Sequence, residues 1–271
     1  MLDTVNTNRP VDDDQITVVR GTVHIKGVSV VFNRAKIRTV ALEPTDLTLE
    51  PGTFTALIGP SGCGKSTLLN VVAGFLKPHT GTIKVDERIV KKPHPSVGVI
   101  FQNFALFPWF SAKGNVNFAL KRLGLTRAQR DEKSMQALRE VGLQDDANKF
   151  PDQLSGGMKQ RVAIARTLSS DPDVLLMDEP FGALDAQTRT RMHGLLTDLW
   201  VRRRTTVLFV THDVDEALRL ADVVYVMSTG PGRIADRIPV DLPRPRSVDR
   251  LDSNFLKLRE QLLGLLQTST H

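Results

Sequence analysis

The sequence has 271 residues, of which 41% are hydrophobic and 24% charged, and a formal net charge of +6. This balance is ordinary for a folded chain with a full core, and it excludes a disordered or fibrous protein. No apolar stretch approaches the roughly 18 residues that span a bilayer, the polar start is unlike a signal sequence, and the single cysteine, Cys63, excludes an internal disulfide, so we expect the chain to stay in the cytoplasm.

The first hundred residues are expected to be mostly sheet. Residues 1–21 show little periodicity and are predicted to form an N-terminal extension. Apolar runs bounded by turn residues predict strands, and an apolar helical pattern follows residue 67. The expected strands cover residues 22–32, 47–49, 54–58, 81–86 and 97–101, and the expected helix covers residues 68–73.

Beyond residue 102 the pattern becomes helical, which predicts a helical insertion over about residues 103–165. Helices and strands then alternate, which indicates an α/β fold with a mostly parallel sheet and ligands at the carboxyl ends of its strands. The expected helices cover residues 113–123, 127–141, 144–149, 157–169, 186–202 and 214–220, and the expected strands cover residues 174–177, 206–210 and 223–227. The main domain should span residues 22–245, and residues 246–271 should form a helical tail.

A glycine-rich loop joins the strand at 54–58 to the helix after it, with the pattern G-x-x-x-x-G-K-[ST]. In this context the pattern predicts a phosphate-binding loop, because the backbone N–H groups turn inward and the helix N-terminus adds partial positive charge. Lys65 would reach the β- and γ-phosphates of a nucleotide, and the Ser66 hydroxyl would contact magnesium. The predicted nucleotide-binding residues are Gly59, Pro60, Ser61, Gly62, Cys63, Gly64, Lys65, Ser66 and Thr67.

Two carboxylates follow the buried strand at 174–177. Successive side chains of a strand point to opposite faces, so Asp178 and Glu179 should do different work. We expect Asp178 to hold magnesium and Glu179 to act as the general base that polarises the attacking water. An Asp-Glu-Pro turn on the surface is the alternative.

A second loop of small residues, Leu-Ser-Gly-Gly at residues 154–157, opens a helix and is therefore a second candidate phosphate site. Two such anion sites, about ninety residues apart, are unusual for a simple kinase or GTPase. The residues of this loop that could face a phosphate are Ser155, Gly156 and Gly157.

The order of these features resembles the ATP-binding subunit of ATP-binding cassette (ABC) transporters over residues 22–245. The resemblance implies the P-loop ABC ATPase fold, with an N-terminal antiparallel β-subdomain, and ATP and Mg²⁺ as ligands. It also implies that two copies close head to tail, so that Ser155, Gly156 and Gly157 of each face the ATP of the other. Asp185 is similar to the residue that communicates between the two sites.

The resemblance extends to single residues elsewhere in the chain. Gln102 is similar to the glutamine that reaches magnesium and the γ-phosphate, and His212 to the histidine that contacts the γ-phosphate. Phe32 stands where an aromatic side chain stacks on adenine, although core packing explains a phenylalanine at a strand end equally well. Met158 replaces the usual glutamine, and a thioether cannot replace the hydrogen bonds of an amide.

Four aromatic residues stand within residues 104–110, directly after Gln102. Such an apolar cluster on a loop is either local core or a socket for a partner. In the family this segment receives a short cytoplasmic helix of the membrane subunit. We therefore expect a partner socket walled by Phe104, Phe107 and Trp109.

Within the family, the chain most resembles the nitrate, sulfonate and taurine importer group. This implies a pair of ABC subunits, two integral-membrane permease subunits, an extracytoplasmic solute-binding protein that acts indirectly, and a place on the cytoplasmic face of the inner membrane. The alternatives are a soluble cassette ATPase that acts on nucleic acid or ribosomes, and a scaffold that binds ATP without hydrolysis. Scattered basic residues without interleaved aromatics argue against nucleic acid, and the presence of Asp178, Glu179 and His212 argues against the scaffold.

Overall fold

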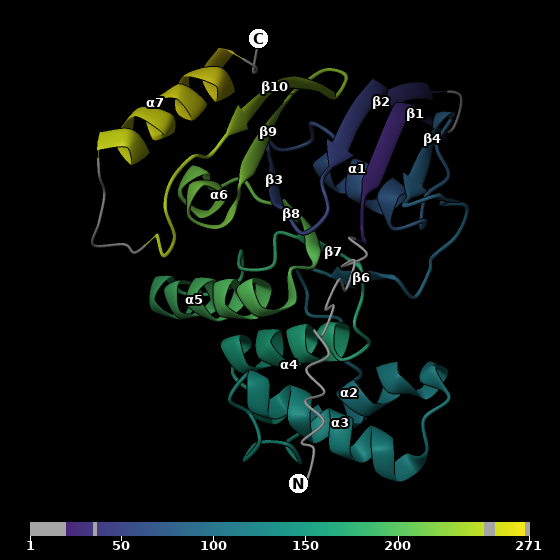
Figure 1. Cartoon of the computed structure of the whole chain (residues 1–271). Coiled ribbons are helices and arrows are strands. Elements are labelled where there is room, and N and C mark those ends of the chain that lie inside the picture. The colour runs from purple at the N-terminus through teal and green to yellow at the C-terminus, as the bar shows by residue number, and fades with distance from the viewer. Residues whose placement is uncertain (1–19, 35–36, 247–252, 269–271) are drawn as a thin grey trace, which may run out of the picture.

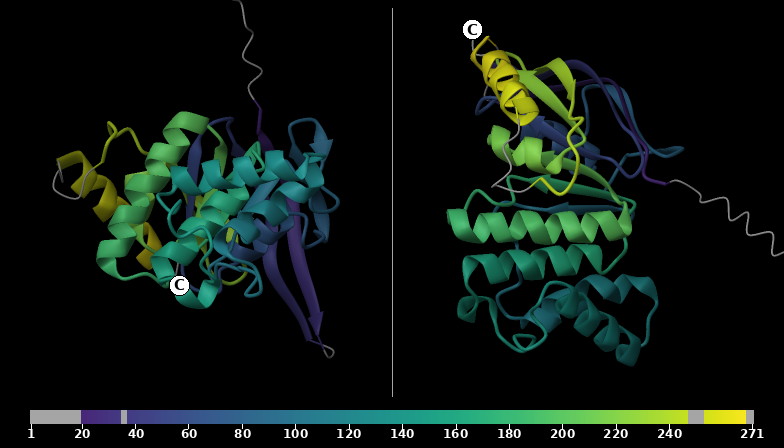
Figure 2. Two further views of the ribbon diagram at one scale, coloured as in Figure 1. Left: turned by 90° about the horizontal axis from the view of Figure 1, so that it is seen from below. Right: turned by 60° about the vertical axis from the view of Figure 1, so that its left-hand side comes forward.

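The computed structural model describes residues 20–34, 37–246 and 253–268, so the expected extension at 1–21 lies almost wholly outside the described residues. Two sheets organise the fold (Figure 1). The first has the order β2-β1-β4-β5 and is antiparallel throughout. Its strands are β1 (Val23–Arg34), β2 (Ile37–Leu49), β4 (Thr80–Val85) and β5 (Arg88–Ile89). The β1–β2 hairpin extends away from the body as a long arm (Figure 2).

The second sheet has six strands in the order β10-β9-β3-β8-β7-β6, and all neighbours are parallel except β10 and β9. Every residue of β3 and β8 is buried. Continuous apolar runs of this kind are typical of parallel strands covered on both faces. The strands are β3 (Phe54–Ile58), β6 (Val97–Ile100), β7 (Val174–Asp178), β8 (Thr206–Val210), β9 (Val223–Ser228) and β10 (Arg233–Pro239).

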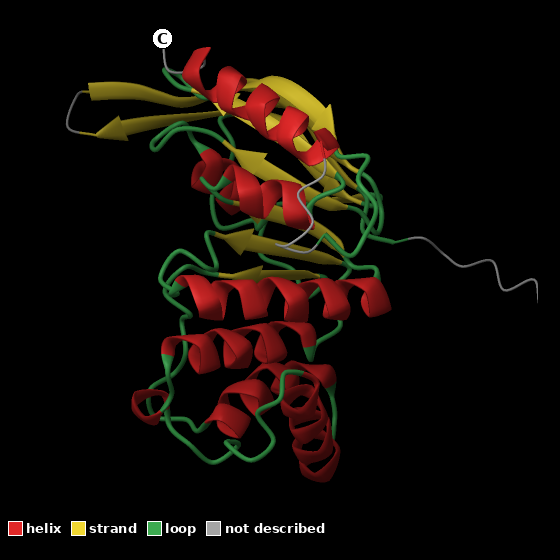
Figure 3. Ribbon diagram, turned by 90° about the vertical axis from the view of Figure 1, so that its left-hand side faces the viewer, coloured by secondary structure: helices red, strands yellow, loops and turns green. Residues whose placement is uncertain are grey.

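Helices cover both faces of this sheet. One face carries α1 (Lys65–Val72) and the antiparallel sheet, and the other carries α4 to α7, with α4 and α5 side by side under the strands (Figure 3). Helices α2 and α3 pack against α4 on the side away from the strands (Figure 1). The helices after α1 are α2 (Ala112–Leu120), α3 (Arg127–Glu140), α4 (Gly156–Leu168), α5 (Ala186–Arg203), α6 (Val214–Leu220) and α7 (Ser253–Thr268), with 3₁₀ turns at Lys121–Leu123 and Pro151–Gln153.

The predicted helix at 144–149 is wrong, because this segment forms isolated turns. Lys149 N–H donates to the Asp146 carbonyl at 3.0 Å, which closes a single turn. The carbonyls of Ala147 and Lys149 instead accept the first two N–H groups of α2, from Lys113 and Ala112, each at 2.8 Å. Free N–H groups at a helix N-terminus need acceptors, and this segment supplies them.

Alternating side chains of the central strands divide the core into two clusters, one on each face of the sheet. On β7, Leu175 and Met177 face α4 and α5, whereas Val174 and Leu176 face α1. Asp178 continues the second set, so the strand itself directs this carboxylate to the face that carries α1. In the part of the chain that the structure describes, no helix is long and apolar enough to cross a membrane.

Candidate nucleotide-binding site

The loop between β3 and α1 has a backbone that only glycine adopts readily. Gly64, at the N-cap of α1, has φ 99° and a Cβ there would lie 2.9 Å from the Ala41 carbonyl oxygen of β2. A Cβ on Gly59 would lie 2.7 Å from the Met227 carbonyl oxygen of β9. Glycines therefore let the loop turn tightly against two strands, as a backbone cradle for an anion requires.

Lys65 is buried beneath this loop, with 6% of the residue exposed. Its Nζ donates to the carbonyl oxygens of Gly59 and Pro60 at 2.7 and 2.9 Å, and lies 3.8 Å from Cys63 Sγ. Burial raises the pKa of the Cys63 thiol, and the Lys65 charge offsets part of this effect. A single ammonium group thus lies at the base of the predicted phosphate loop, held by the loop's own carbonyls.

The carboxylate at the end of β7, Asp178, meets α1. Ser66 Oγ donates to Asp178 Oδ1 at 2.9 Å, which joins the two oxygen groups that the sequence assigns to magnesium. Burial raises the pKa of Asp178 and the charge of Glu179 adds to this shift, while the Ser66 hydrogen bond and Lys65 oppose it. These oxygens lie close enough together to share one hard cation.

The second carboxylate takes a different direction. Glu179 has φ 43°, in the left-handed region that is costly for a side chain with a Cβ, and its N–H donates to the Val210 carbonyl at 3.0 Å. Its Oε2 lies 3.2 Å from Nδ1 of His212, which follows β8 and has 63% of its side chain exposed. The strained backbone thus accompanies a carboxylate that meets an exposed imidazole rather than α1.

Gln102 borders the same place from the end of β6. A Cβ on Gly182 would lie 3.5 Å from Gln102 Nε2 and 3.8 Å from Glu179 Oε2, so both side chains lie next to Gly182. Phe32 is half-buried and packs against the cluster on the α1 face, on the same hairpin as Ala41. The structure therefore brings Gln102 beside Glu179 and leaves Phe32 on the arm.

The Leu-Ser-Gly-Gly loop lies at the N-terminus of α4, against the start of α5. Ser155 Oγ caps α4 by accepting Met158 N–H at 3.3 Å, and a Cβ on Gly157 would lie 2.5 Å from Thr188 Cγ2. Asp185 caps α5 by accepting Thr188 N–H at 2.9 Å, and this hydrogen bond lowers the pKa of Asp185. Ser155, Gly156 and Asp185 are all exposed, so two capped helix starts share one surface.

The aromatic segment after Gln102 extends further than the sequence indicated. Phe104 packs half-buried against the core, whereas Trp109 is 66% exposed. Phe107 contacts Trp109 and also Phe118 of α2, with ring centroids 5.7 and 4.6 Å apart. A cleft of about 670 Å³ is lined by Phe107 but by neither Phe104 nor Trp109, and its aromatic walls are Phe75, Phe101, Phe107 and Phe118.

Arg166 of α4 holds this segment and was not predicted from the sequence. Its guanidinium donates to the carbonyls of Ala105 and Phe104 at 2.6 and 3.2 Å, and lies 5.8 Å from the centre of the Phe107 ring. Phe104 and Ala105 have φ 60° and 45°. The sequence contains no indication of this contact, because Arg166 and the carbonyls that it binds lie about sixty positions apart.

These features define a class of protein. A strand, a glycine-rich loop and a helix form an anion cradle with a buried lysine, and β7, which β8 separates from β3, brings two carboxylates to the same end of the sheet, as in the P-loop nucleotide hydrolases. The ABC transporter family matches residues 42–182. The chain belongs to this family, and it is an ATP-binding cassette with ATPase function.

Relatives that match most of the chain include three with a named solute. The nitrate import ATP-binding protein of Synechococcus elongatus is 44% identical, over 92% of this chain and 93% of its own. The taurine import ATP-binding protein of Pseudomonas aeruginosa is 45% identical, over 88% and 93%. The bicarbonate transport ATP-binding protein of a Synechocystis strain is 44% identical, over 89% and 88%. The resemblance to ABC transporters is confirmed.

A solved dimer of an ATP-binding cassette in a post-hydrolysis state, bound to ADP and Pi, has the same fold. Its TM-score is 0.72 at 30% sequence identity, and the match covers 82% of this chain and 100% of the other. The predicted α/β cassette fold, with one mostly parallel and one antiparallel sheet, is therefore confirmed.

Proposed function

We propose that this cassette hydrolyses Mg-ATP to drive an importer of a small anion. The observation that carries the proposal is the divergence of two adjacent carboxylates: Asp178 bonds to Ser66 on the phosphate-loop helix, and Glu179 pairs with His212. This divergence supports separate tasks for the two residues: Asp178 would hold the metal that binds the phosphates, and Glu179 would activate the attacking water.

The oxygen groups present fit magnesium. Among the residues that the structure describes, no group of three or more His, Cys, Asp or Glu side chains could by itself enclose a metal. Magnesium is commonly bound by only one or two carboxylates and fills much of its shell with phosphate oxygens and water. Ser66, Asp178 and Gln102 would hold it, and the ion would neutralise charge that develops on the phosphates.

The remaining groups have distinct tasks at the phosphates. The N–H groups of residues 59–67 and the Lys65 ammonium would bind the β- and γ-phosphates. Glu179 would take a proton from the attacking water, and His212, whose Nδ1 lies 3.2 Å from Glu179 Oε2, would orient that carboxylate, while the same side chain would contact the γ-phosphate. Phe32 would stack on adenine.

A second cassette would complete the site. The exposed Ser155, Gly156 and Asp185 lie together at two helix starts, and an exposed helix N-terminus with Ser and Gly at its first turn suits a phosphate. We infer that this surface, with Gly157, faces the phosphate loop of the partner subunit. The related solved cassette is itself a dimer, which supports this arrangement.

A membrane subunit would occupy the aromatic cleft beside α2. Phe107 and the exposed Trp109 project from the segment that directly follows Gln102, and Phe104 anchors this segment to the core. The socket would thereby connect the permease to the catalytic site, and would hold the cassette on the cytoplasmic face of the membrane. Relatives that are named for nitrate, taurine and bicarbonate transport favour a small anion as solute, and they do not favour the nucleic-acid alternative.

Glu179→Gln tests the function directly. The amide cannot accept the proton of water, so we expect kcat for ATP hydrolysis to fall by about 10²–10⁴ with ATP binding retained and a dimer trapped on ATP. Lys65→Ala should instead weaken nucleotide binding, and Glu132→Gln, on an exposed position of α3, is the matched control. Phosphate release, nucleotide titration and size-exclusion chromatography measure the three effects, and undiminished turnover in Glu179→Gln would remove Glu179 from this role.

A further inference from the structure

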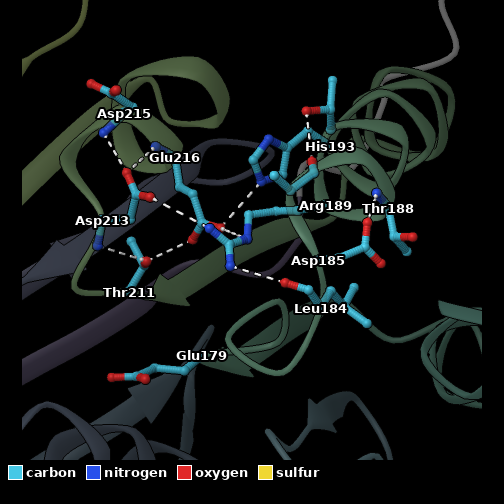
Figure 4. A network of polar contacts seen from close by, with 12 residues as sticks. Glu179, Leu184, Asp185, Thr188, Arg189, His193, Thr211, Asp213, Asp215 and Glu216 are labelled. Atoms are coloured by element: carbon cyan, nitrogen blue, oxygen red, sulfur yellow. Dashed lines mark hydrogen bonds and ion pairs between the residues drawn. The ribbon is translucent and has the colours of Figure 1, made fainter. Parts of the chain in front are cut away.

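A buried carboxylate lies behind the Glu179–His212 pair and has no part in the proposed chemistry. Glu216 of α6 is 6% exposed. Its Oε2 accepts the Thr211 hydroxyl at 2.7 Å, and its Oε1 lies 3.3 Å from His193 Nε2 and 3.6 Å from Arg189 Nε (Figure 4). Burying a charge is costly unless several partners compensate it, so this cluster is a rigid unit rather than a solvated surface pair.

The segment that carries His212 is fixed by the same cluster. Asp213 N–H donates to Thr211 Oγ1 at 3.0 Å, and Asp213 Oδ1 accepts the N–H groups of Asp215 and Glu216 at 2.8 and 3.1 Å. His212 therefore stands at the apex of a closed hydrogen-bonded loop. Its exposed ring reaches Glu179, while the base of the loop is tied to Glu216.

The segment that carries Glu179 returns to the cluster through two turns. Gly182 N–H donates to the Glu179 carbonyl at 3.2 Å, and Leu184 N–H donates to the Phe181 carbonyl at 3.0 Å. These turns bring the Leu184 carbonyl next to α5, where Arg189 Nη2 donates to it at 3.0 Å.

One guanidinium thus contacts both segments. Arg189 lies between the Leu184 carbonyl and the Glu216 carboxylate (Figure 4), and its Nη1 lies 4.0 Å from Asp213 Oδ2. The planar fork of arginine donates a hydrogen bond to the Leu184 carbonyl and at the same time faces two carboxylates in other directions, at 3.6 and 4.0 Å, which the single ammonium of lysine cannot do.

We infer that Arg189 is a positioning residue, which keeps Glu179 and His212 in register by joining their two segments on the side away from the phosphates. The inference depends on the proposed roles of Glu179 and His212. A displacement of about 1 Å between catalytic groups can cost roughly a hundredfold in rate, so loss of this link should lower kcat with little change in the KM for ATP.

Arg189→Met tests the inference, with Arg191→Met as the matched control, because Arg191 is exposed on the same helix. We expect Arg189→Met to lower kcat about tenfold or more, at unchanged nucleotide affinity, and Arg191→Met to leave both unchanged. Arg189→Lys, which keeps the charge and much of the volume, should recover only part of the activity, and it decides the matter if Arg189→Met does not fold. A proportionate loss of folded protein, with normal kcat per folded molecule, would overturn the inference.

A double-mutant cycle separates this inference from the proposed function. If Arg189 acts through the catalytic pair, Arg189→Met should have a much smaller effect on kcat in a His212→Ala background than in the parent protein. Equal fold-losses in the two backgrounds would overturn the positioning role. If His212→Ala and Glu179→Gln themselves leave turnover intact, the proposed function fails instead, and that result is distinguishable from the first.

Discussion

Asp178 and Glu179 are adjacent in the chain, but their carboxylates meet different side chains, Ser66 and His212. Asp178 ends β7 in a regular extended backbone, so its carboxylate follows the strand alternation to Ser66. Glu179 has φ 43°, which breaks that alternation and directs its carboxylate to His212. Left-handed backbone at a non-glycine residue costs about 1–3 kcal/mol. The strain is consistent with a functional constraint, since a relaxed backbone would place the carboxylate elsewhere.

The burial of Cys63 should make its thiol unreactive. The residue is 1% exposed, and burial raises the pKa of its thiol, so the reactive thiolate is scarce in the native protein. Because the folded pKa is raised, the buried thiol favours the fold below about pH 8.5, and this contribution is lost as the pH rises through the raised pKa.

We expect iodoacetamide to alkylate native Cys63 about tenfold or more slowly than the urea-unfolded chain at pH 7 to 9. Mass spectrometry of the alkylated fraction against time measures both rates, with no competing thiol in the chain. Similar rates in the two states would contradict the burial of this side chain.

Among the elements, the segment after β6 connects Gln102, which lies beside Glu179, to the aromatic cleft. Phe104 and Ala105 of this segment have a left-handed backbone, and Arg166 of α4 donates hydrogen bonds to the carbonyls of both. Phe107 and Trp109 follow them in the chain. Burial lowers the pKa of Arg166, but not enough to discharge a guanidinium at neutral pH. The geometry of this segment therefore depends on one cation.

Arg166→Met should leave the two carbonyls without their donor and let the backbone relax. We expect the free energy of unfolding to fall by about 1–3 kcal/mol, and iodide quenching of Trp109 fluorescence to change, since Trp109 packs on Phe107. Urea denaturation and quenching titrations measure these effects, and Arg139→Met, on an exposed position of α3, is the control. Unchanged stability together with unchanged quenching would show that Arg166 does not fix the segment.

The elements that could be predicted from sequence are those with a local cause. β3, β7 and β8 are short apolar runs with turn residues at their ends, and their positions are confirmed. β10 and most of β2 were missed although each pairs with the strand directly before it in the chain, because charged residues and proline interrupt their apolar runs. Residues 144–149 have helical composition, but their carbonyls are taken by α2.

The same distinction applies to the candidate site. The residues of the phosphate loop and the two carboxylates stand in contiguous motifs, and the structure places them beside one another. Arg166 and Arg189 gave no signal, because their roles depend on carbonyls and carboxylates brought close only by the packing of α4, α5 and α6. Every residue has a backbone carbonyl, so the sequence does not show which residues will accept such a hydrogen bond.

At the scale of the whole molecule, the proposed import function predicts a growth phenotype. We expect the source organism carrying Lys65→Ala in place of the intact chain to fail on one anion, with taurine as sole sulfur source, nitrate as sole nitrogen source or limiting bicarbonate as the three conditions. Growth on rich medium and equal amounts of the two proteins by immunoblot are the controls. Equal growth under all three conditions would contradict import of these anions.

The pairing of β3 with β8 and β9 has a consequence for synthesis. Residues 54–58 leave the ribosome long before residues 206–210 and 223–228, which form both of their neighbours. At 5–20 residues per second this delay lasts roughly 8–30 s, during which the phosphate-loop strand has no sheet to join. The antiparallel sheet, built from nearby segments, can form early, whereas an interrupted chain that ends before residue 206 should not bind ATP. A chain should therefore become able to bind nucleotide only when its synthesis is nearly complete.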